Sequence, residues 1–504
     1  MGPHRESIGI ARNALTSYGA RGLLAISVLL LTPYLFRGLG PGGFGTWSVI
    51  FSLTAVALLL QIGFSQGIIK IVAELRAQRR DVELQAALGA GTWLMAAAGV
   101  FVLVVAVLAM FTLTGLAADD QREAFRAGVL FMGAALAIRL PCMAYAAALV
   151  GHQRYDLANI GAVTTTVVFA LGAVIAVESG AGVAGVAGAQ AAALIAGSAA
   201  YAVALRRLAP ELSLRPRPGE RDARKTILRF SAFTLIADGM VLAGQRLDVV
   251  AIAALAGAVV AGPYAAVVKL QSGVQALTRP FIDLLMPMVS DLGARGERSE
   301  ILRRLSLTTR LALQITLPAA AVLAVFSTDA IDLWLGAGAP QSTATIVIVL
   351  MVVNVIAVFT SPATEALIGL GRVRLIAGLA VGEGALNVAL TLVLVATHGA
   401  IGAAIGTLTA SALFAPLRLP LVIRATGGSA ARFAREALVV PLASSAPAIA
   451  SILAVFALMD PGWERLLLGT VAGLGLGLAV ALAQIGPTRV RDALRVRRMR
   501  PVTS

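Results

Sequence analysis

Hydrophobic residues occur in long blocks along the chain, and most charged residues fall in the short polar intervals between them. Each block has about the 20 residues that an α-helix needs to cross about 30 Å of hydrocarbon. Strands that do not close into a barrel cannot satisfy their backbone polar groups in lipid, so the blocks are expected to be helices. The pattern predicts about fourteen membrane-spanning segments, at residues 18–36, 48–70, 84–111, 127–150, 157–177, 183–205, 230–255, 263–289, 307–326, 343–370, 375–396, 401–423, 438–459 and 466–485.

The longest polar interval, residues 206–229, divides the chain. It contains eight Lys or Arg and three prolines, which break any regular element. Six predicted segments precede it and eight follow it. We therefore predict a six-helix N-terminal lobe (1–205), a basic cytosolic linker (206–229), a six-helix C-terminal lobe (230–425), and two additional helices with a basic cytosolic tail (426–504).

The two lobes resemble each other in sequence. When residues 148–163 are laid on residues 366–381, seven of sixteen positions are identical, including Gly151 with Gly369 and Arg154 with Arg372. After a one-residue gap, GVAGVAG from Gly182 lies on the glycine-rich stretch from Gly399. Both halves have six segments and both start on the same side. The pattern predicts two parallel repeats that form two lobes around a central cavity.

Composition and charge place the chain in the membrane class. With 504 residues, 58% hydrophobic, 13% charged and a mean hydropathy of +0.87, it lies far outside the soluble globular range. The net charge of +15 could indicate a nucleic-acid partner, but most Lys and Arg fall in the intervals on one predicted side of the membrane. This asymmetry follows the positive-inside rule. It argues against nucleic acid and predicts that both termini are cytosolic.

Little in the sequence indicates a metal or cofactor. The one cysteine, Cys142, excludes internal disulfides and cysteine-based zinc sites, and its apolar neighbours favour a packing role. The histidines, at positions 4, 152 and 398, are scattered over termini and turns. We expect neither a bound metal nor a cofactor.

Charged residues inside the predicted segments are the candidate site residues, because each costs about 2.5 to 3.5 kcal/mol on insertion scales. The basic candidates are Arg21, Arg139, Lys269 and Arg279, although Arg21 could also lie at the cytosolic interface. Lys269, Arg279 and Asp283 share one face of segment 263–289. The alternative is a buried helix in which Arg279 simply pairs with Asp283. A basic cavity would suit an anionic substrate, most plausibly a phosphate-bearing one.

Acidic candidates for ion coupling or for pairing with these cations lie mainly in the second half: Asp238, Asp248, Asp283, Glu365 and Glu383. Asp238 and Glu383 are deep within their segments. Asp248 could instead lie close to the outer surface with Arg246, and Glu365 could lie near the cytosolic end.

Several short motifs occur in a recognisable order: RGLGPGGFGTW after the first segment, QIGFSQGIIKIVAEL, ALVGHQRYD, GQRLDVVAI and AGPYAAVVKL. Together they resemble the polysaccharide-transport (O-antigen or exopolysaccharide repeat-unit) flippases of the multidrug, oligosaccharidyl-lipid and polysaccharide exporter superfamily, over residues 8 to about 425. The resemblance implies a bacterial inner-membrane protein that moves undecaprenyl-diphosphate-linked oligosaccharide to the outer leaflet by alternating access through a cationic cavity. It implies that Arg21, Arg139, Lys269 and Arg279 face the diphosphate and sugar acids. Other polysaccharide-assembly membrane proteins would be its partners.

Three alternatives remain open. One is the peptidoglycan lipid-precursor flippase, which also has fourteen helices and basic cavity residues. Another is a drug or cation antiporter of the same superfamily, although predicted segments one to six hold no deep Asp or Glu. The third is a membrane oligosaccharide polymerase or ligase, but such enzymes carry a large external loop that this chain lacks, so we do not expect an enzyme.

Overall fold

The computed structural model describes residues 3–212, 215–218, 224–225, 227–228, 247–336 and 339–485. Within these ranges the regular elements are all helices, and ten helical stretches are long and apolar enough to cross a membrane. The chain forms two compact units, Met1–Ala265 and Ala266–Ser504, and their boundary falls within one helix. The chain is thus an all-α integral membrane protein, as the hydrophobic blocks predict.

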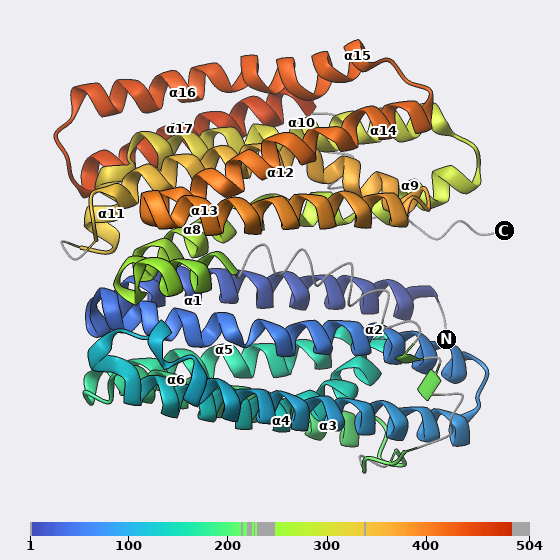
Figure 1. Ribbon diagram of the computed structural model, residues 1–504. Coiled ribbons are helices and arrows are strands. Elements are labelled where there is room, and N and C mark those ends of the chain that lie inside the picture. The colour runs from blue at the N-terminus through green and yellow to red at the C-terminus, as the bar shows by residue number, and fades with distance from the viewer. Residues whose placement is uncertain are drawn as a thin grey trace. The chain divides into compact units, whose positions relative to one another are not determined.

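The helices of the first unit match the first six predicted segments. The long α1 bends at Gly40, so its second part and α2 together correspond to segment two. Helices α3 to α6 follow with short connections (Figure 1). Of predicted segment seven, residues 247–256 are described and helical, and the rest, with Asp238, lies outside the described residues. The bounds are α1 Pro3–Leu53, α2 Ala55–Ala77, α3 Asp81–Thr112, α4 Arg122–Gly151, α5 Tyr155–Glu178 and α6 Gly182–Leu208.

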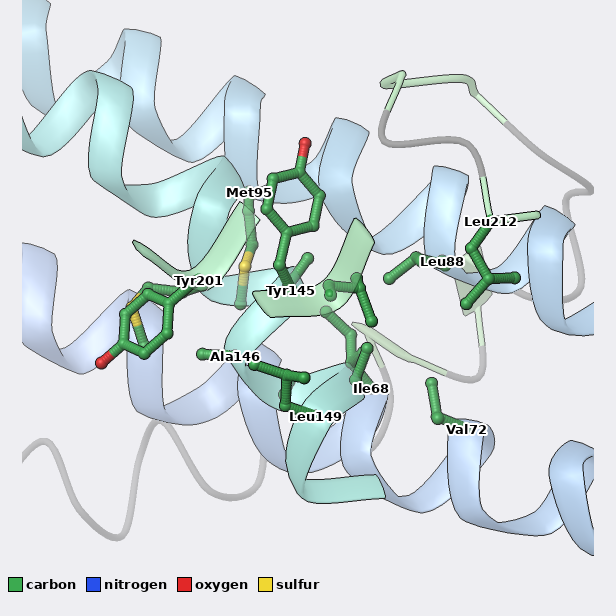
Figure 2. Close-up of a cluster of buried hydrophobic side chains, with 14 of the residues drawn as sticks. Ile68, Val72, Leu88, Met95, Tyr145, Ala146, Leu149, Tyr201 and Leu212 are labelled. Atoms are coloured by element: carbon green, nitrogen blue, oxygen red, sulfur yellow. The ribbon is translucent and has the colours of Figure 1, made fainter. Parts of the chain in front are cut away.

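The core of the first unit lies where α2, α3, α4 and α6 meet (Figure 2). Met95, Tyr145 and Tyr201 pack there among small residues of α4. Two residues of the polar interval, Leu212 and Ile227, are buried in the same cluster. The linker is therefore anchored to the helices by apolar contacts. Apolar side chains that face away from this core, such as Leu108, are exposed, as expected for helices that face lipid tails.

The second unit contains the remaining predicted segments. Segments eleven and twelve form α13, which breaks at Gly399, and its continuation α14. The short α11 was not predicted. The two additional C-terminal helices are present as α16 and α17, and both pack on α10 (Figure 1). The bounds are α8 Ala258–Asp283, α9 Leu285–Ala294, α10 Arg298–Val325, α11 Ser327–Trp334, α12 Ser342–Gly369, α13 Val373–Phe414, α14 Arg418–Thr426, α15 Ala430–Ala434, α16 Val440–Leu458 and α17 Trp463–Ile485.

Equivalent turns support the internal repeat. Positive φ angles recur in both halves at a nearly constant spacing along the chain: Gly40 and Gly257, Arg79 and Gly296, Gln153 and Gly371, Gly182 and Gly399. The hydrogen bonds repeat as well. The Arg154 amide donates to the Leu149 carbonyl at 2.9 Å, and the Arg372 amide donates to the Leu367 carbonyl at 2.9 Å. The two halves therefore end and restart their helices with the same backbone geometry.

The repeat also explains the glycine-rich first turn. A Cβ on Gly45 would lie 1.8 Å from the Ala258 carbonyl oxygen, and one on Gly262 would lie 2.4 Å from the Pro41 carbonyl oxygen. Gly45 and Gly262 are separated by the same interval as Gly40 and Gly257, so they occupy equivalent positions in the two repeats. The start of α8 approaches α1 so closely that only glycine fits at either position.

Candidate functional site

Arg139 lies near the middle of α4 and is half-buried. Its Nη1 atom is buried and has no hydrogen-bond partner among the described residues. Helix α4 continues through Pro141, so Arg139 lies within the helix and not at its end. An arginine inside a membrane helix normally pairs with an acid or with backbone carbonyls. Arg139 therefore presents a cationic nitrogen whose hydrogen-bonding capacity the described protein does not use.

Arg279 in α8 has two acidic neighbours in the second unit. Its Nε lies 2.6 Å from Asp283 Oδ1, one turn further along α8, and its Nη2 lies 3.5 Å from Glu365 Oε1 of α12. The Arg279 side chain remains 58% exposed, whereas Glu365 is 15% exposed. The sequence left pairing and a cavity-lining role open for Arg279. The structure shows the pair, and it adds a second carboxylate from a helix that sequence spacing did not connect.

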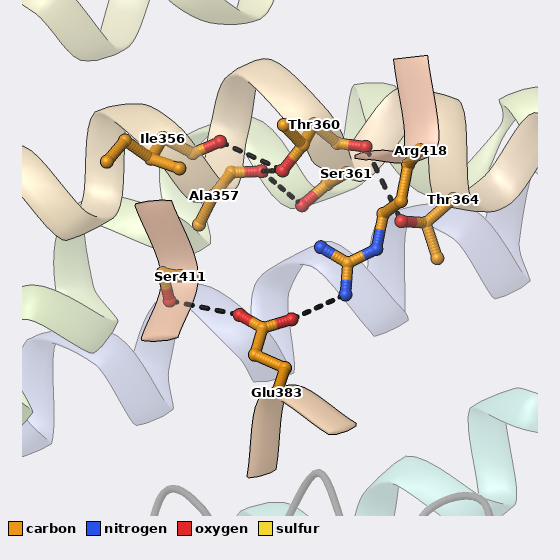
Figure 3. Close-up of polar contacts among 8 residues, drawn as sticks. All are labelled: Ile356, Ala357, Thr360, Ser361, Thr364, Glu383, Ser411 and Arg418. Carbon is orange, nitrogen blue, oxygen red and sulfur yellow. Dashed lines mark hydrogen bonds and ion pairs between the residues drawn. The ribbon is translucent and has the colours of Figure 1, made fainter. Parts of the chain in front are cut away.

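Glu383 in α13 is held by two residues that follow the break at Gly399 (Figure 3). Ser411 Oγ donates to Glu383 Oε1 at 3.0 Å, and Arg418 Nη2 donates to Glu383 Oε2 at 2.6 Å. The Arg418 and Glu383 side chains are 11% and 22% exposed, so the pair is largely shielded. Sequence analysis singled out Glu383 and missed Arg418. The two residues are distant in sequence, and only the break at Gly399 within α13 brings the segment that carries Arg418 back to Glu383.

The other predicted site residues are placed as follows. Lys269 is half-buried on α8. Asp248 is buried and accepts a hydrogen bond from the Tyr264 hydroxyl at 3.0 Å. Arg21 belongs to α1, but its side chain is outside the described residues. The structure thus brings Arg279, Asp283 and Glu365 together, and it leaves Glu383 in a separate pair.

A second buried pair also escaped the sequence analysis. Arg465 of α17 donates from Nε and Nη2 to both carboxylate oxygens of Asp329 in α11, at 2.7 and 2.6 Å. Arg465 also donates to the Met459 carbonyl at 3.3 Å and lies 4.7 Å from the Phe456 ring centre. Both charges lie at segment ends, where sequence alone suggests solvent. The pair ties the last helix to the rest of the second unit, so its role is structural.

Clusters of three or more His, Cys, Asp or Glu that could hold a metal ion are not found in the described part of the chain. The membrane helices instead carry arginines: Arg279, Arg418 and Arg465 have acidic partners, and Arg139 has a buried Nη1 atom without a hydrogen-bond partner among the described residues. Guanidinium groups bind phosphate oxygens with two parallel hydrogen bonds, so this chemistry suits a phosphate-bearing anion.

Comparison with known proteins gives one family and one fold. Residues 10–292 match the family described as polysaccharide biosynthesis protein. A search of curated proteins gave no match. A multidrug resistance MATE family transporter of the MOP superfamily, in an inward-facing conformation, aligns with a TM-score of 0.69 at 15% identity, over 83% of this chain and 98% of that one.

Two further solved structures share the fold. The lipid II flippase MurJ, in an inward closed conformation, aligns with a TM-score of 0.68 at 12% identity, over 96% of this chain and 99% of MurJ. A MOP superfamily transporter from Pyrococcus furiosus, described as having a binding pocket of reverse polarity, aligns with a TM-score of 0.54 at 17% identity, over 83% of this chain and 95% of that one. At these identities the likeness shows the fold alone.

Proposed function

Because the chain belongs to the polysaccharide biosynthesis protein family, we propose that it is a flippase for undecaprenyl-diphosphate-linked oligosaccharide. Its multi-pass helical fold is that of MOP superfamily transporters and flippases. In this proposal both termini are cytosolic, and the protein carries the lipid-linked glycan from the cytosolic to the outer leaflet of a bacterial cytoplasmic membrane. No bond of the substrate is made or broken, so the protein acts as a transporter and not as an enzyme.

The observation that carries the proposal is the unused donor of Arg139. Burying a cation without a partner is costly, so a position of this kind is a functional candidate. A diphosphate offers several anionic oxygens and would complete the hydrogen bonds of the guanidinium. Arg139 would therefore bind the head of the substrate while its lipid tail stays in the bilayer and its glycan crosses with the head.

The basic residues of the second half would act later in the cycle. Arg279 is half-exposed and shares its charge between Asp283 and Glu365. A diphosphate that reached Arg279 would have to displace these carboxylates, and their return would release the substrate. Lys269 lies on the same helix and would add attraction without the two-pronged geometry of arginine. Alternating access would expose the bound diphosphate first to one side of the membrane and then to the other.

The distribution of acidic side chains favours this function over a drug or cation antiporter. Every acidic side chain that the structure describes in α2 to α6 lies within the first or last turn of its helix. A cation site in the first half would need an acidic group at depth.

The test is transport by the purified full-length protein in vesicles, with fluorescent undecaprenyl-diphosphate oligosaccharide as the substrate and an outer-leaflet quencher as the readout. We expect Arg139→Gln to slow transport by at least about tenfold, because one charge-assisted hydrogen bond is worth roughly that factor. Arg126→Gln is the matched control, since Arg126 is exposed near the N-terminal end of α4.

Three results would contradict the proposal. Equal transport by wild type and Arg139→Gln would remove Arg139 from the substrate path. Transport of lipid II in preference to the oligosaccharide would favour the peptidoglycan-precursor alternative. Efflux of a cationic dye without lipid transport would favour the antiporter.

A further inference from the structure

A pocket of about 590 Å³ lies beside the C-terminal halves of α4 and α6. Its lining consists of Tyr145 from α4, of Ala202 and Arg206 from α6, and of Pro210, Leu212, Arg215 and Pro216 from the segment that follows α6. The volume falls within the range of about 300 to 1,000 Å³ that small-molecule sites have. The pocket is separate from the charges on which the proposed function rests, since Arg139, Lys269 and Arg279 are not in its lining.

The walls of this pocket are fixed by contacts outside it. Leu212 is 6% exposed and packs in the core cluster of the first unit. The Arg217 amide donates to the Gly89 carbonyl of α3 at 3.2 Å, which fastens residues 215–218 against that helix. Pro216 and Pro218 restrict the backbone of the same stretch. Arg215 therefore lies on a stretch that is hydrogen-bonded to α3, and it lines the same pocket as Arg206 of α6.

The chemistry of the lining selects an anion with an apolar attachment. Two guanidinium groups from two different elements can contact one phosphate from two directions. The Tyr145 side chain is buried in the core cluster, and its hydroxyl points away from the other labelled side chains (Figure 2). Ala202, Leu212 and the two prolines supply apolar surface beside the charges. A compact phosphate-bearing headgroup fits these features better than a cation or an uncharged sugar.

We propose that the pocket formed by Tyr145, Arg206 and Arg215 is a binding site for a phosphate-bearing headgroup. The phosphate contacts Arg206 and Arg215, and the apolar lining accommodates the carbon atoms attached to it. The phosphate is supplied either by a lipid of the adjacent leaflet or by a soluble phosphate compound. The site holds this group whether or not the protein transports a glycan.

The experiment uses the full-length protein and two probes. Inorganic pyrophosphate is titrated into the detergent-purified protein by calorimetry, and retention of phosphatidylglycerol over phosphatidylcholine from mixed bilayers is measured by native mass spectrometry. The pocket variant is Arg206→Gln with Arg215→Gln. The control variant is Arg207→Gln with Arg217→Gln, which removes the same charge from the same two segments while sparing the pocket lining.

We expect the pocket variant to bind about 100-fold more weakly, roughly tenfold for each lost charge-assisted contact, and the control to bind like wild type. Loss confined to pyrophosphate assigns the site to a soluble phosphate compound, and loss confined to phosphatidylglycerol assigns it to a lipid. Equal binding by all three proteins, or equal loss in both variants, overturns the site, since the attraction would then be diffuse. Because binding is read without transport, neither result affects the test of Arg139.

Discussion

The two repeats share their turns but not their charges. The first repeat has Arg139 in the middle of α4, and the interval that relates Gly151 to Gly369 places Ala357 of α12 at the equivalent position. The second repeat has the Glu383–Arg418 pair, and the interval that relates Gly182 to Gly399 places Tyr201 opposite Arg418 in the alignment. The backbone positions with positive φ, by contrast, recur through both halves. The two repeats thus share the backbone geometry of the turns between their helices, while the charged residues within the helices differ.

This difference separates two uses of arginine. In the second unit Arg279, Arg418 and Arg465 each lie within 4 Å of a carboxylate. In the first unit Arg139 has a buried nitrogen with no partner within the described residues. A paired arginine contributes to stability or modulates charge, whereas Arg139 would bind an external anion under the proposed function. The predictions below test this contrast through stability, measured as the free energy of unfolding in detergent.

The largest effect is expected at the Asp329–Arg465 pair. Arg465→Ala leaves the Asp329 carboxylate buried without a partner, which should lower the free energy of unfolding by about 3 kcal/mol. Chemical denaturation followed by fluorescence measures the change. Arg303→Ala is the control, because the Arg303–Glu300 pair is on an exposed helix face and should matter little. An equal loss in both variants would show that the Asp329–Arg465 pair is no more important than a surface pair.

A smaller loss is expected at Glu383. Glu383→Gln keeps the shape and the acceptor for Ser411 but removes the charge opposite Arg418, which should cost about 2 kcal/mol. The same denaturation measurement applies. Glu297→Gln, which changes an exposed acid just before α10, serves as the control. An unchanged stability in Glu383→Gln would mean that Arg418 does not depend on this carboxylate.

For Arg139 the comparison predicts the opposite sign. Arg139→Met removes a guanidinium whose buried Nη1 atom has no hydrogen-bond partner among the described residues. The free energy of unfolding should stay the same or rise by up to about 1 kcal/mol, while transport falls. A loss similar to that of Arg465→Ala would reveal that Arg139 has a structural partner, and the contrast between the two units would then fail.

The smallest effect is a pH dependence of the first unit. His152 follows α4, its Nδ1 lies 2.8 Å from the Ala148 carbonyl oxygen, and burial lowers its pKa below the ordinary value of about 6.5. Below about pH 6.5 the His152 side chain is protonated in the unfolded chain but still largely neutral in the folded protein. The free energy of unfolding therefore falls as the pH drops below about 6.5.

Thermal unfolding at about pH 7.5 and about pH 5.5 measures this effect. His152→Gln should reduce the acid-induced decrease in Tm, and His398→Gln, at an exposed position, should leave it unchanged. The same acid-induced decrease in His152→Gln and wild type would show that other groups cause it.

The sequence was sufficient for those features that depend on local order along the chain. Hydrophobic blocks of membrane length determined the positions of the helices, because each spanning helix satisfies its own backbone hydrogen bonds. The repeat was visible because equivalent stretches keep identical residues, such as Gly151 with Gly369 and Arg154 with Arg372. The i and i+4 spacing of Arg279 and Asp283 also made their contact one of the two interpretations that the sequence left open.

Only the tertiary structure decided which distant charges meet. Glu365 reaches Arg279 from another helix, Arg418 reaches Glu383 across the break at Gly399, and Arg465 reaches Asp329 from the last helix. Hydrophobicity determines that a helix enters the membrane, but not which face it turns to its neighbours, since lipid and protein interior are both apolar. The pairing of charges is therefore set by packing, and the unused donor of Arg139 becomes apparent only when its neighbours are known.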